Sequence, residues 1–374
     1  MTATGSSPVR VTVVDPSAYT PAYDHAFSAA LARSGASVQL VTSRFAYGEV
    51  PAPDGYGLRE LFYRRARGAA GSRARRLSKL ASHAGDMRAL QKLTADTADI
   101  VHFQWLVMPW LDAGLLPGGP LVLTAHDLLP REPKPGQARA QLRLLRRMSA
   151  VVVHSQYGRG QLVSRLGVPG DKVHVIHHGA FEHVVAGPRS PLPGGLQSVT
   201  EPVVLFFGLV RPYKGVTTLL DAWRGVTGAE LWVVGRPMMD IGPLRSAATG
   251  SVRFVDRYVP EHEVQAYFRR ADVIVLPYER TERFDQSGVL ATALAFGKPV
   301  VLTDIGGFPE VAATGAGRLV PAGDVDALRD ALQWLIDEPA ARTRLGEAAI
   351  AAARGPYSWE SAARRTLELY RALL

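Results

Sequence analysis

The sequence predicts an α/β protein made of two doubly wound domains, each built around a parallel sheet. Three observations support this fold class. The chain has 374 residues, which is too long for one ordinary core and suits two. Apolar runs of strand length alternate with helical patterns, as they do in βαβ units. This alternation stops over residues 184–200, which hold three prolines and three glycines and predict a linker, and then starts again.

The first domain, residues 1–183, is expected to begin with a buried strand, VRVTVV at 9–14. A loop rich in proline and tyrosine follows, and residues 24–35 then predict a helix that stops at Gly35. Runs of valine, isoleucine and leucine predict the remaining strands, at 36–42, 99–103, 119–126, 149–155 and 172–179.

The second domain, residues 201–356, repeats the pattern, and residues 357–374 predict a C-terminal helix that packs back on the first domain. In doubly wound domains ligands bind beyond the carboxyl ends of the strands, so the loops there are the places to search for a site. Strands are expected at 201–208, 229–235, 251–255, 271–277, 298–304 and 317–321, and helices at 216–224, 287–296 and 324–338.

The composition is that of a globular protein, with 47% hydrophobic and 21% charged residues. No apolar run approaches the ~20 residues that a membrane-spanning helix needs. The first residues lack the basic region and the apolar run of a secretory signal. The chain has no cysteine, which excludes disulfides, thiolate metal sites and a cysteine nucleophile. We therefore expect a cytoplasmic protein.

Positive charge is concentrated in the first half of the chain. Residues 1–183 hold 22 Lys+Arg and 13 Asp+Glu, so they account for the whole net charge of +9. Arginines cluster at 59–92 and 131–147, where they can attract nucleic acid, anionic lipid or a phosphorylated substrate, or form a solvated helix surface. A basic nucleic-acid- or membrane-surface-binding module is therefore an alternative function. No nucleic-acid-binding motif is present, so we expect no nucleic-acid partner, while peripheral contact with the inner membrane surface stays open.

The stretch FFGLVRPYKG, residues 206–215, carries the strongest chemical signal. An apolar strand ends at Gly208, which allows a sharp turn and the close approach of a ligand. Arg211 can direct two hydrogen bonds at phosphate oxygens, and Lys214 adds a point charge beside them. Two cations at a strand–helix junction suit a diphosphate, and especially the charge that builds on it as it leaves. A surface turn with two solvated cations is the alternative.

A second stretch, residues 285–311, places polar residues at the start of a helix. The free amide groups of a first helical turn bind anions without any charged side chain. Gly288 leaves room for a ligand to lie against the backbone. A capped helix packed against the sheet is the alternative, but it does not account for the polar run. The candidate ligand contacts here are Asp285, Gln286, Ser287, Gly288 and Val289.

With these motifs the chain resembles family 4 of the glycosyltransferases. FGLVRPYKG is similar to that family's donor-phosphate motif, and AFGKPVVLTDIGGFPEV to its C-terminal donor signature. DIVHFQW, LTAHD, GRLVPAGDVDALRDAL and the closing YSW…LY helix follow in the family's usual order, so the resemblance covers nearly the whole chain.

The resemblance implies the GT-B fold, in which two Rossmann-like domains face a central cleft. It implies a retaining transferase that takes a sugar from a UDP-, GDP- or dTDP-linked donor held by the second domain, with no cofactor. The acceptor, held by the first domain, would be anionic, lipid-linked or a small natural product.

By the same resemblance, Arg211 and Lys214 grip the donor diphosphate, and the helix start at 287–289 adds amide donors. His126 matches the family's active-site histidine near the transferred sugar. The alternative for that residue is a structural histidine at a strand end, whose hydrogen bonds are all made within the protein.

The chain departs from the family at two places. The usual Glu-x7-Glu pair is replaced by Phe284 and Thr292, so either Thr292 or another group must bind the ribose hydroxyls. The usual N-terminal glycine pair is replaced by DPSAYTPAYDH. Within that loop Tyr19, Tyr23 and His25 could face the cleft or pack the loop.

Other enzyme classes fit less well. A dinucleotide-dependent dehydrogenase needs a glycine fingerprint after the first strand, and none is present. Asp324 and Asp326 spell a metal-binding Asp-x-Asp, but they open an amphipathic helix, so helix capping accounts for them and we expect no metal. An epimerase or a phosphorylase of the GT-B fold stays open as an alternative.

Overall fold

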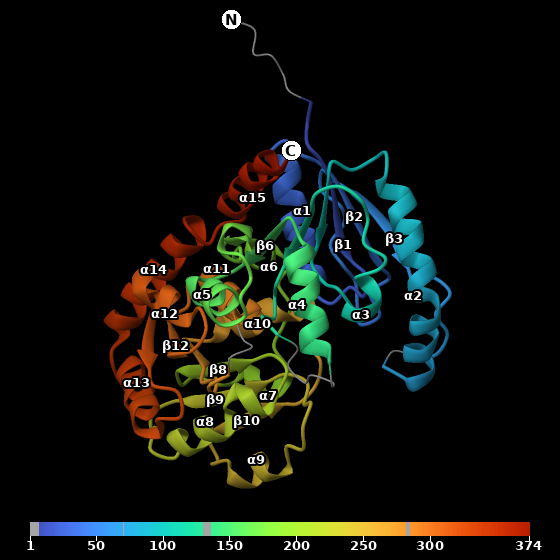
Figure 1. Cartoon of the computed structure of the whole chain (residues 1–374). Coiled ribbons are helices and arrows are strands. Elements are labelled where there is room, and N and C mark those ends of the chain that lie inside the picture. The colour runs from blue at the N-terminus through green and yellow to red at the C-terminus, as the bar shows by residue number, and fades with distance from the viewer. Residues whose placement is uncertain (1–6, 70, 130–135, 282–284) are drawn as a thin grey trace, which may run out of the picture. The chain divides into compact units, whose positions relative to one another are not determined.

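The structure is a computed structural model, and it describes residues 7–69, 71–129, 136–281 and 285–374. Contacts divide the chain into two units. The first unit comprises Met1–Gly179 and Trp359–Leu374, and the second comprises Ala180–Ser358. The chain therefore leaves the first unit, builds the second and returns, as the colours from blue to red trace in Figure 1.

The first unit contains a parallel sheet of seven strands in the order β3-β2-β1-β4-β5-β6-β7. The order changes direction between β1 and β4, which is the switch point where doubly wound sheets bind ligands. The strands are β1 Arg10–Asp15, β2 Ser37–Ser43, β3 Gly57–Phe62, β4 Ile100–Phe103, β5 Leu121–Thr124, β6 Ala150–Val153 and β7 Val173–Val175.

Helices cover both faces of this sheet, which is why its central strands are mostly apolar. On β4, Val101 and Phe103 join the core on one face, while His102 between them points to the other. There His102 bonds Tyr370 of the C-terminal helix, as expected for a helix that packs back on the first domain. The helices are α1 Pro21–Arg33, α2 Arg73–Thr94, α3 Pro109–Asp112, α4 Gln137–Arg147, α5 Gln156–Gly160 and α15 Trp359–Leu373.

The second unit contains a parallel sheet of six strands in the order β10-β9-β8-β11-β12-β13. Its switch point lies between β8 and β11. The strands are β8 Val203–Phe207, β9 Glu230–Val234, β10 Val252–Val255, β11 Val273–Leu276, β12 Val300–Thr303 and β13 Gly317–Val320.

Alternate residues of β8 enter two separate cores, one on each face of the second sheet. Val203 and Leu205 pack with α10, α11 and α14, whereas Val204 and Phe206 pack with α8 and α13. The helices of this unit are α6 Glu182–Ala186, α7 Gly194–Gln197, α8 Val216–Trp223, α9 Gly242–Ala247, α10 Glu261–Arg270, α11 Gly288–Ala295, α12 Phe308–Val311, α13 Val325–Asp337 and α14 Pro339–Arg354.

The predicted linker 184–200 differs from the structure. It contributes the end of α6 and the whole of α7 to the second unit rather than spanning freely. Val184 and Leu196 are buried, so the segment is anchored by its few apolar residues despite the prolines around them. The sequence analysis missed β3, an edge strand that is mostly exposed, and several helices, among them α2, α4, α10 and α14.

The Asp-x-Asp sequence caps a helix, as predicted. The carboxylate of Asp324 accepts a hydrogen bond from the Ala327 amide at 2.9 Å, and Asp326 pairs with Arg329 at the surface. In the part of the chain that the structure describes, no helix has both the length and the apolar character to cross a bilayer.

Candidate functional site

The loop after β8 turns sharply at Gly208, whose φ of +104° lies in the left-handed region. A Cβ atom there would lie 3.1 Å from the Lys214 ammonium and 3.3 Å from a methyl group of Val289. Gly208 therefore allows the ammonium and the start of α11 to close over the end of β8. These three predicted site residues lie together.

Lys214 is held in place although it is charged. Its side chain is only 8% exposed, and its Nζ lies 5.1 Å from the centroid of the Tyr278 ring, which follows β11. Tyr278 in turn shares a hydrogen bond of 3.2 Å with the Ser287 hydroxyl. The contact with Tyr278 joins the loops after β8 and β11, so the cation lies at the switch point of the sheet.

Arg211 precedes the short 3-10 turn Pro212–Lys214, and its carbonyl accepts the Lys214 amide at 3.0 Å. Its Nε is buried and has no hydrogen-bond partner among the described residues. Buried N–H groups are almost always paired in folded proteins. An N–H group of this kind suits an oxygen atom that a ligand supplies.

The start of α11 differs in detail from the prediction. The helix begins at Gly288, one residue later than expected, because Ser287 has extended backbone angles. The Ser287 amide donates to the Gln286 side chain at 3.0 Å, so this amide is already engaged within the protein. Asp285 is fully buried, and its carbonyl accepts the Gly307 amide at 2.8 Å, which fixes the entry to the helix.

Of the two residues that replace the family's acid pair, the structure describes only Thr292. Phe284 lies outside the described residues. Thr292 is buried in α11, and its hydroxyl donates to the Gly288 carbonyl of the same helix at 2.9 Å. The hydroxyl proton of Thr292 is thus used inside the helix, which leaves its oxygen as an acceptor.

In the first unit His126 follows β5 and lies between aromatic rings. The Trp105 ring stacks on it at 5.2 Å, and the Tyr23 ring meets it edge-on at 4.6 Å. Its Nε2 lies 3.0 Å from Oε1 of Gln104, and its Nδ1 lies 3.4 Å from His154. The start of α1 and the loops after β4, β5 and β6 therefore converge on one imidazole, at the carboxyl edge of the sheet.

Burial keeps His126 and its neighbours neutral. Burial, reinforced by the nearby histidines, holds the pKa of His126 well below its usual range. Burial likewise lowers the pKa of His102 and His154 to about 3 and that of His178 to about 4. A neutral imidazole can orient a sugar by hydrogen bonding without drawing a proton from water at neutral pH.

The loop that replaces the family's glycine pair is shaped by two buried carboxyl groups. Asp15 accepts the amides of Ser17, Tyr19 and Thr20, and it forms a hydrogen bond with Asp24. Burial raises the pKa of both carboxyl groups, and the charge of Asp15 raises that of Asp24 further. The three amides stabilise the charged form of Asp15, so Asp24 is the carboxyl that keeps its proton.

The aromatic and histidine residues of this loop divide as follows. Tyr23 packs on His126, and Tyr19 is exposed but meets the Trp105 ring edge-on at 5.4 Å. His25 instead packs the loop, with its Nδ1 2.5 Å from the Tyr56 hydroxyl. The sequence analysis assigned no role to the residues that directly follow β4 and β6, Gln104, Trp105 and His154. Their place at the ends of strands was a signal for all three, and Gln104 and Trp105 also close the quoted motif DIVHFQW.

Comparisons with known proteins match both units. A family model described as "Glycosyltransferase Family 4" matches residues 23–180, and one described as "Glycosyl transferases group 1" matches residues 201–338. A D-inositol 3-phosphate glycosyltransferase of an Arthrobacter species is 30% identical over 308 residues, which cover 73% of this chain and 70% of the relative. A phosphatidyl-myo-inositol mannosyltransferase of Mycobacterium leprae is 39% identical over 176 residues, which cover 45% of this chain and 46% of the relative.

Two solved structures share the fold across nearly their whole length. HepE of Anabaena, solved in complex with UDP and glucose, superposes with a TM-score of 0.74 at 17% identity and covers 97% of this chain and 100% of HepE. The sucrose-phosphate synthase of Thermosynechococcus elongatus has the same TM-score at 19% identity and covers 97% of this chain and 98% of the synthase. The two Rossmann-like units are thus those of the GT-B fold.

Proposed function

Because the chain belongs to family 4 of the glycosyltransferases, we propose that it transfers a sugar from a nucleotide-diphosphate donor to an acceptor with retention of the anomeric configuration. One observation carries the donor assignment. The strand at the switch point of the second sheet is followed by a buried ammonium, Lys214, and by a buried N–H of Arg211 that has no partner in the described part of the chain. Cations and N–H groups fixed before the ligand arrives suit a pyrophosphate.

The donor nucleotide is UDP, GDP or dTDP. HepE was solved with UDP and glucose, which supports a nucleoside diphosphate as part of the donor. The amides of Gly288 and Val289, at the start of α11, add N–H donors near Lys214. Because Gly208 has no side chain, the diphosphate can approach the backbone there and reach the ammonium.

The proposed reaction needs no protein nucleophile. The acceptor hydroxyl attacks the anomeric carbon on the face from which the phosphate departs, so the new carbon–oxygen bond replaces the old one on the same side. The departing phosphate oxygen takes the hydroxyl proton. Arg211 and Lys214 stabilise the negative charge that grows on the diphosphate as the bond breaks. No metal ion enters this proposal.

The first unit supplies the acceptor side. His126, fixed between Trp105 and Tyr23, orients the transferred sugar by a hydrogen bond. The names of the matched relatives point to phosphorylated polyols and their lipids as acceptors, D-inositol 3-phosphate and phosphatidyl-myo-inositol among them. An acceptor that carries an anionic group fits the positive charge of residues 1–183.

Replacing Lys214 tests the donor assignment. Lys214→Met keeps the apolar stem over Tyr278 but removes the charge, so turnover should fall about 100-fold or more while the melting temperature changes little. Turnover is measured with the donor that stabilises the wild-type protein most in a thermal-shift panel of UDP, GDP, dTDP and their sugars. Arg224→Ala, an exposed cation on the same unit, is the matched control and should leave turnover unchanged. Near-native turnover of Lys214→Met would refute the assignment.

A further inference from the structure

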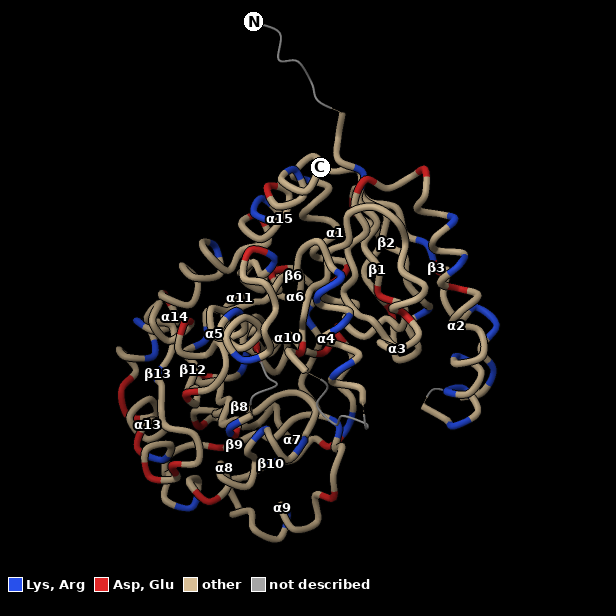
Figure 2. The backbone as a smooth tube through the Cα atoms, in the orientation of Figure 1, with Lys and Arg blue, Asp and Glu red and all other residues tan. Residues whose placement is uncertain are grey.

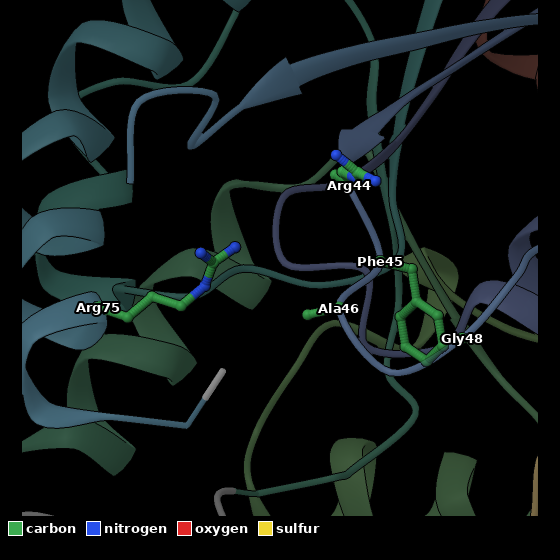
Figure 3. Close-up of a pocket in the computed structure, with 5 residues that line it drawn as sticks. All are labelled: Arg44, Phe45, Ala46, Gly48 and Arg75. Carbon is green, nitrogen blue, oxygen red and sulfur yellow. The ribbon is translucent and has the colours of Figure 1, made fainter. Parts of the chain in front are cut away.

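The first unit has a pocket of about 440 Å³ beside the carboxyl end of β2. The segment after β2 supplies four of its lining residues, and α2 supplies the fifth. Figure 3 shows Arg75 extending from α2 toward the segment after β2, with Arg44 where that segment begins and the Phe45 ring beyond. The lining residues are Arg44, Phe45, Ala46, Gly48 and Arg75.

The pocket is positively charged. Among the residues that the structure describes, its lining has two guanidinium groups from separate elements and no carboxylate. Neither arginine forms an ion pair within the described ranges. One Nη atom of Arg75 lies 3.4 Å from the carbonyl oxygens of Ala66 and Gly68, which steadies the side chain and leaves its other N–H groups available.

Lys79 lies one turn beyond Arg75 on α2, and its pKa responds to the positive charge of Arg75. Burial lowers the pKa of Lys79, and the charge of Arg75 lowers it further. The Lys79 ammonium lies 4.6 Å from the Tyr63 ring centroid. Figure 2 shows Lys and Arg along much of α2, so the pocket lies beside a basic helix of the first unit.

The pocket and His126 lie at the same edge of the first sheet. The strand β2 leads into the pocket and β5 leads into His126, and both belong to one parallel sheet, so their carboxyl ends lie along one edge. Ligands bind at this edge in doubly wound domains. Tyr19, which meets the Trp105 ring, and Trp105, which stacks on His126, lie at the same edge.

The wall formed by α2 is preorganised by a buried clamp of three side chains. The Tyr63 hydroxyl donates to Nδ1 of His83 at 2.7 Å, and Nε2 of His83 donates to Asp112 at 2.5 Å. These bonds tie the end of β3, α2 and α3 together. Ser72 also caps α2 by accepting the Arg75 amide at 3.2 Å. Arg75 is therefore presented from a rigid support rather than from a free loop.

We propose that the pocket between Arg44 and Arg75 binds the phosphate group of a phosphorylated acceptor, while the hydroxyl to be glycosylated lies toward His126. Two guanidinium groups on opposite walls match the several oxygens of a phosphate ester, and the Phe45 side offers an apolar surface to the carbon skeleton. This assignment rests on the proposed glycosyltransferase function. It adds the residues that bind the phosphate group of the acceptor and select a phosphate ester.

The test is calorimetric titration with a small polyol phosphate, myo-inositol 1-phosphate, in a Lys214→Ala background that weakens the competing donor-phosphate site. Arg44→Gln and Arg75→Gln should each weaken binding at least ~10-fold, because each removes charge-assisted hydrogen bonds. Arg73→Gln, an exposed arginine on the same helix outside the pocket, is the matched control and should change affinity less than about twofold. Equal weakening by all three substitutions, or no binding of the ester, would overturn the assignment.

A second arm separates a soluble ester from a lipid headgroup. Sedimentation with phosphatidylcholine vesicles, with and without phosphatidylglycerol, is measured for the same variants. If Arg44→Gln and Arg75→Gln, but not Arg73→Gln, abolish binding to the anionic vesicles, the phosphate belongs to a lipid. If they weaken only the binding of the soluble ester, the acceptor is free in solution. Either outcome supports the pocket.

Failure of this inference can be told apart from failure of the proposed function. If nucleoside diphosphates stabilise the protein but polyol phosphates do not bind, only the pocket assignment is wrong. If polyol phosphates bind with the expected selectivity but no donor nucleotide does, only the transferase proposal is wrong.

Discussion

At the scale of single residues, the loop after β1 holds two carboxyl groups that share one proton. Asp15 accepts three backbone amides and a hydrogen bond from Asp24, while Thr20 donates to Asp24 at 3.3 Å and accepts from Trp105 at 3.0 Å. Since Trp105 stacks on His126, the shape of this loop helps to place the imidazole. A network of this kind replaces the flexible glycine pair that the family uses.

Replacing each acid by asparagine tests which of the two holds the shared proton. Asp24→Asn should cost less than about 1 kcal/mol of unfolding free energy, because an amide can donate to Asp15 and accept from Thr20 as the protonated acid does. Asp15→Asn should cost about 3 kcal/mol or more, because three amides lose a charged acceptor. Urea unfolding at neutral pH measures both. Equal losses for the two variants would contradict the assignment of the proton to Asp24.

Some site residues could be predicted from the sequence and others could not. Arg211 and Lys214 stand out because a short run between strand and helix holds both cations. Tyr278 does not, because its contact with the Lys214 ammonium joins loops that only the order of the strands brings together. Trp105 and His154 likewise depend on the packing of neighbouring strands around His126.

At the scale of elements, α2 shows why a helix can escape detection. Its buried residues, His83, Met87, Leu90 and Thr94, follow a helical spacing, but two of the four are polar, so no apolar stripe is visible. What holds the helix is the clamp of Tyr63, His83 and Asp112. The strands with continuous apolar runs were predictable because both faces of each sheet are covered.

The clamp can be tested by removing its central member. His83→Leu should lower the unfolding free energy by about 3–5 kcal/mol, because Oδ1 of the buried Asp112 loses its charged or hydrogen-bonding partner and only Oδ2 keeps one, the Met108 amide. Hydrogen exchange along α2 should become faster in the same variant. Arg88→Ala, exposed on the same helix, serves as the control and should change neither quantity appreciably. Unchanged protection of α2 in His83→Leu would show that apolar packing alone holds the helix.

At the scale of the whole molecule, the buried histidines make stability depend on pH. A histidine whose folded pKa lies below that of the unfolded chain takes up a proton on unfolding, so the stability present above about pH 6.5 is lost as the pH falls toward the folded value. His102, His126, His154 and His178 all shift in this direction. Asp24 is protonated in the folded state and releases its proton on unfolding, so it reduces the net proton uptake by one.

The net uptake at pH 5 should be about three protons, so the unfolding free energy should fall by about 4 kcal/mol per pH unit there. Urea unfolding at a series of pH values between 7.5 and 5 measures this slope. His102→Gln should reduce it by about one proton. A stability that stays flat over this range would mean that the histidines already take up protons in the folded protein.

The path of the chain has a consequence for biosynthesis. The first unit is interrupted after Gly179 and resumes at Trp359, and the two residues touch so closely that a Cβ atom on Gly179 would lie 2.2 Å from the indole ring. The strands of the first unit are therefore synthesised before the whole of the second unit, and the last helix of the first unit is synthesised after it. Until then His102 lacks its Tyr370 partner. The second unit, whose ends are joined by the bond from the Ala180 amide to the Tyr357 carbonyl, can close on its own while the nascent first unit is still short of its final helix.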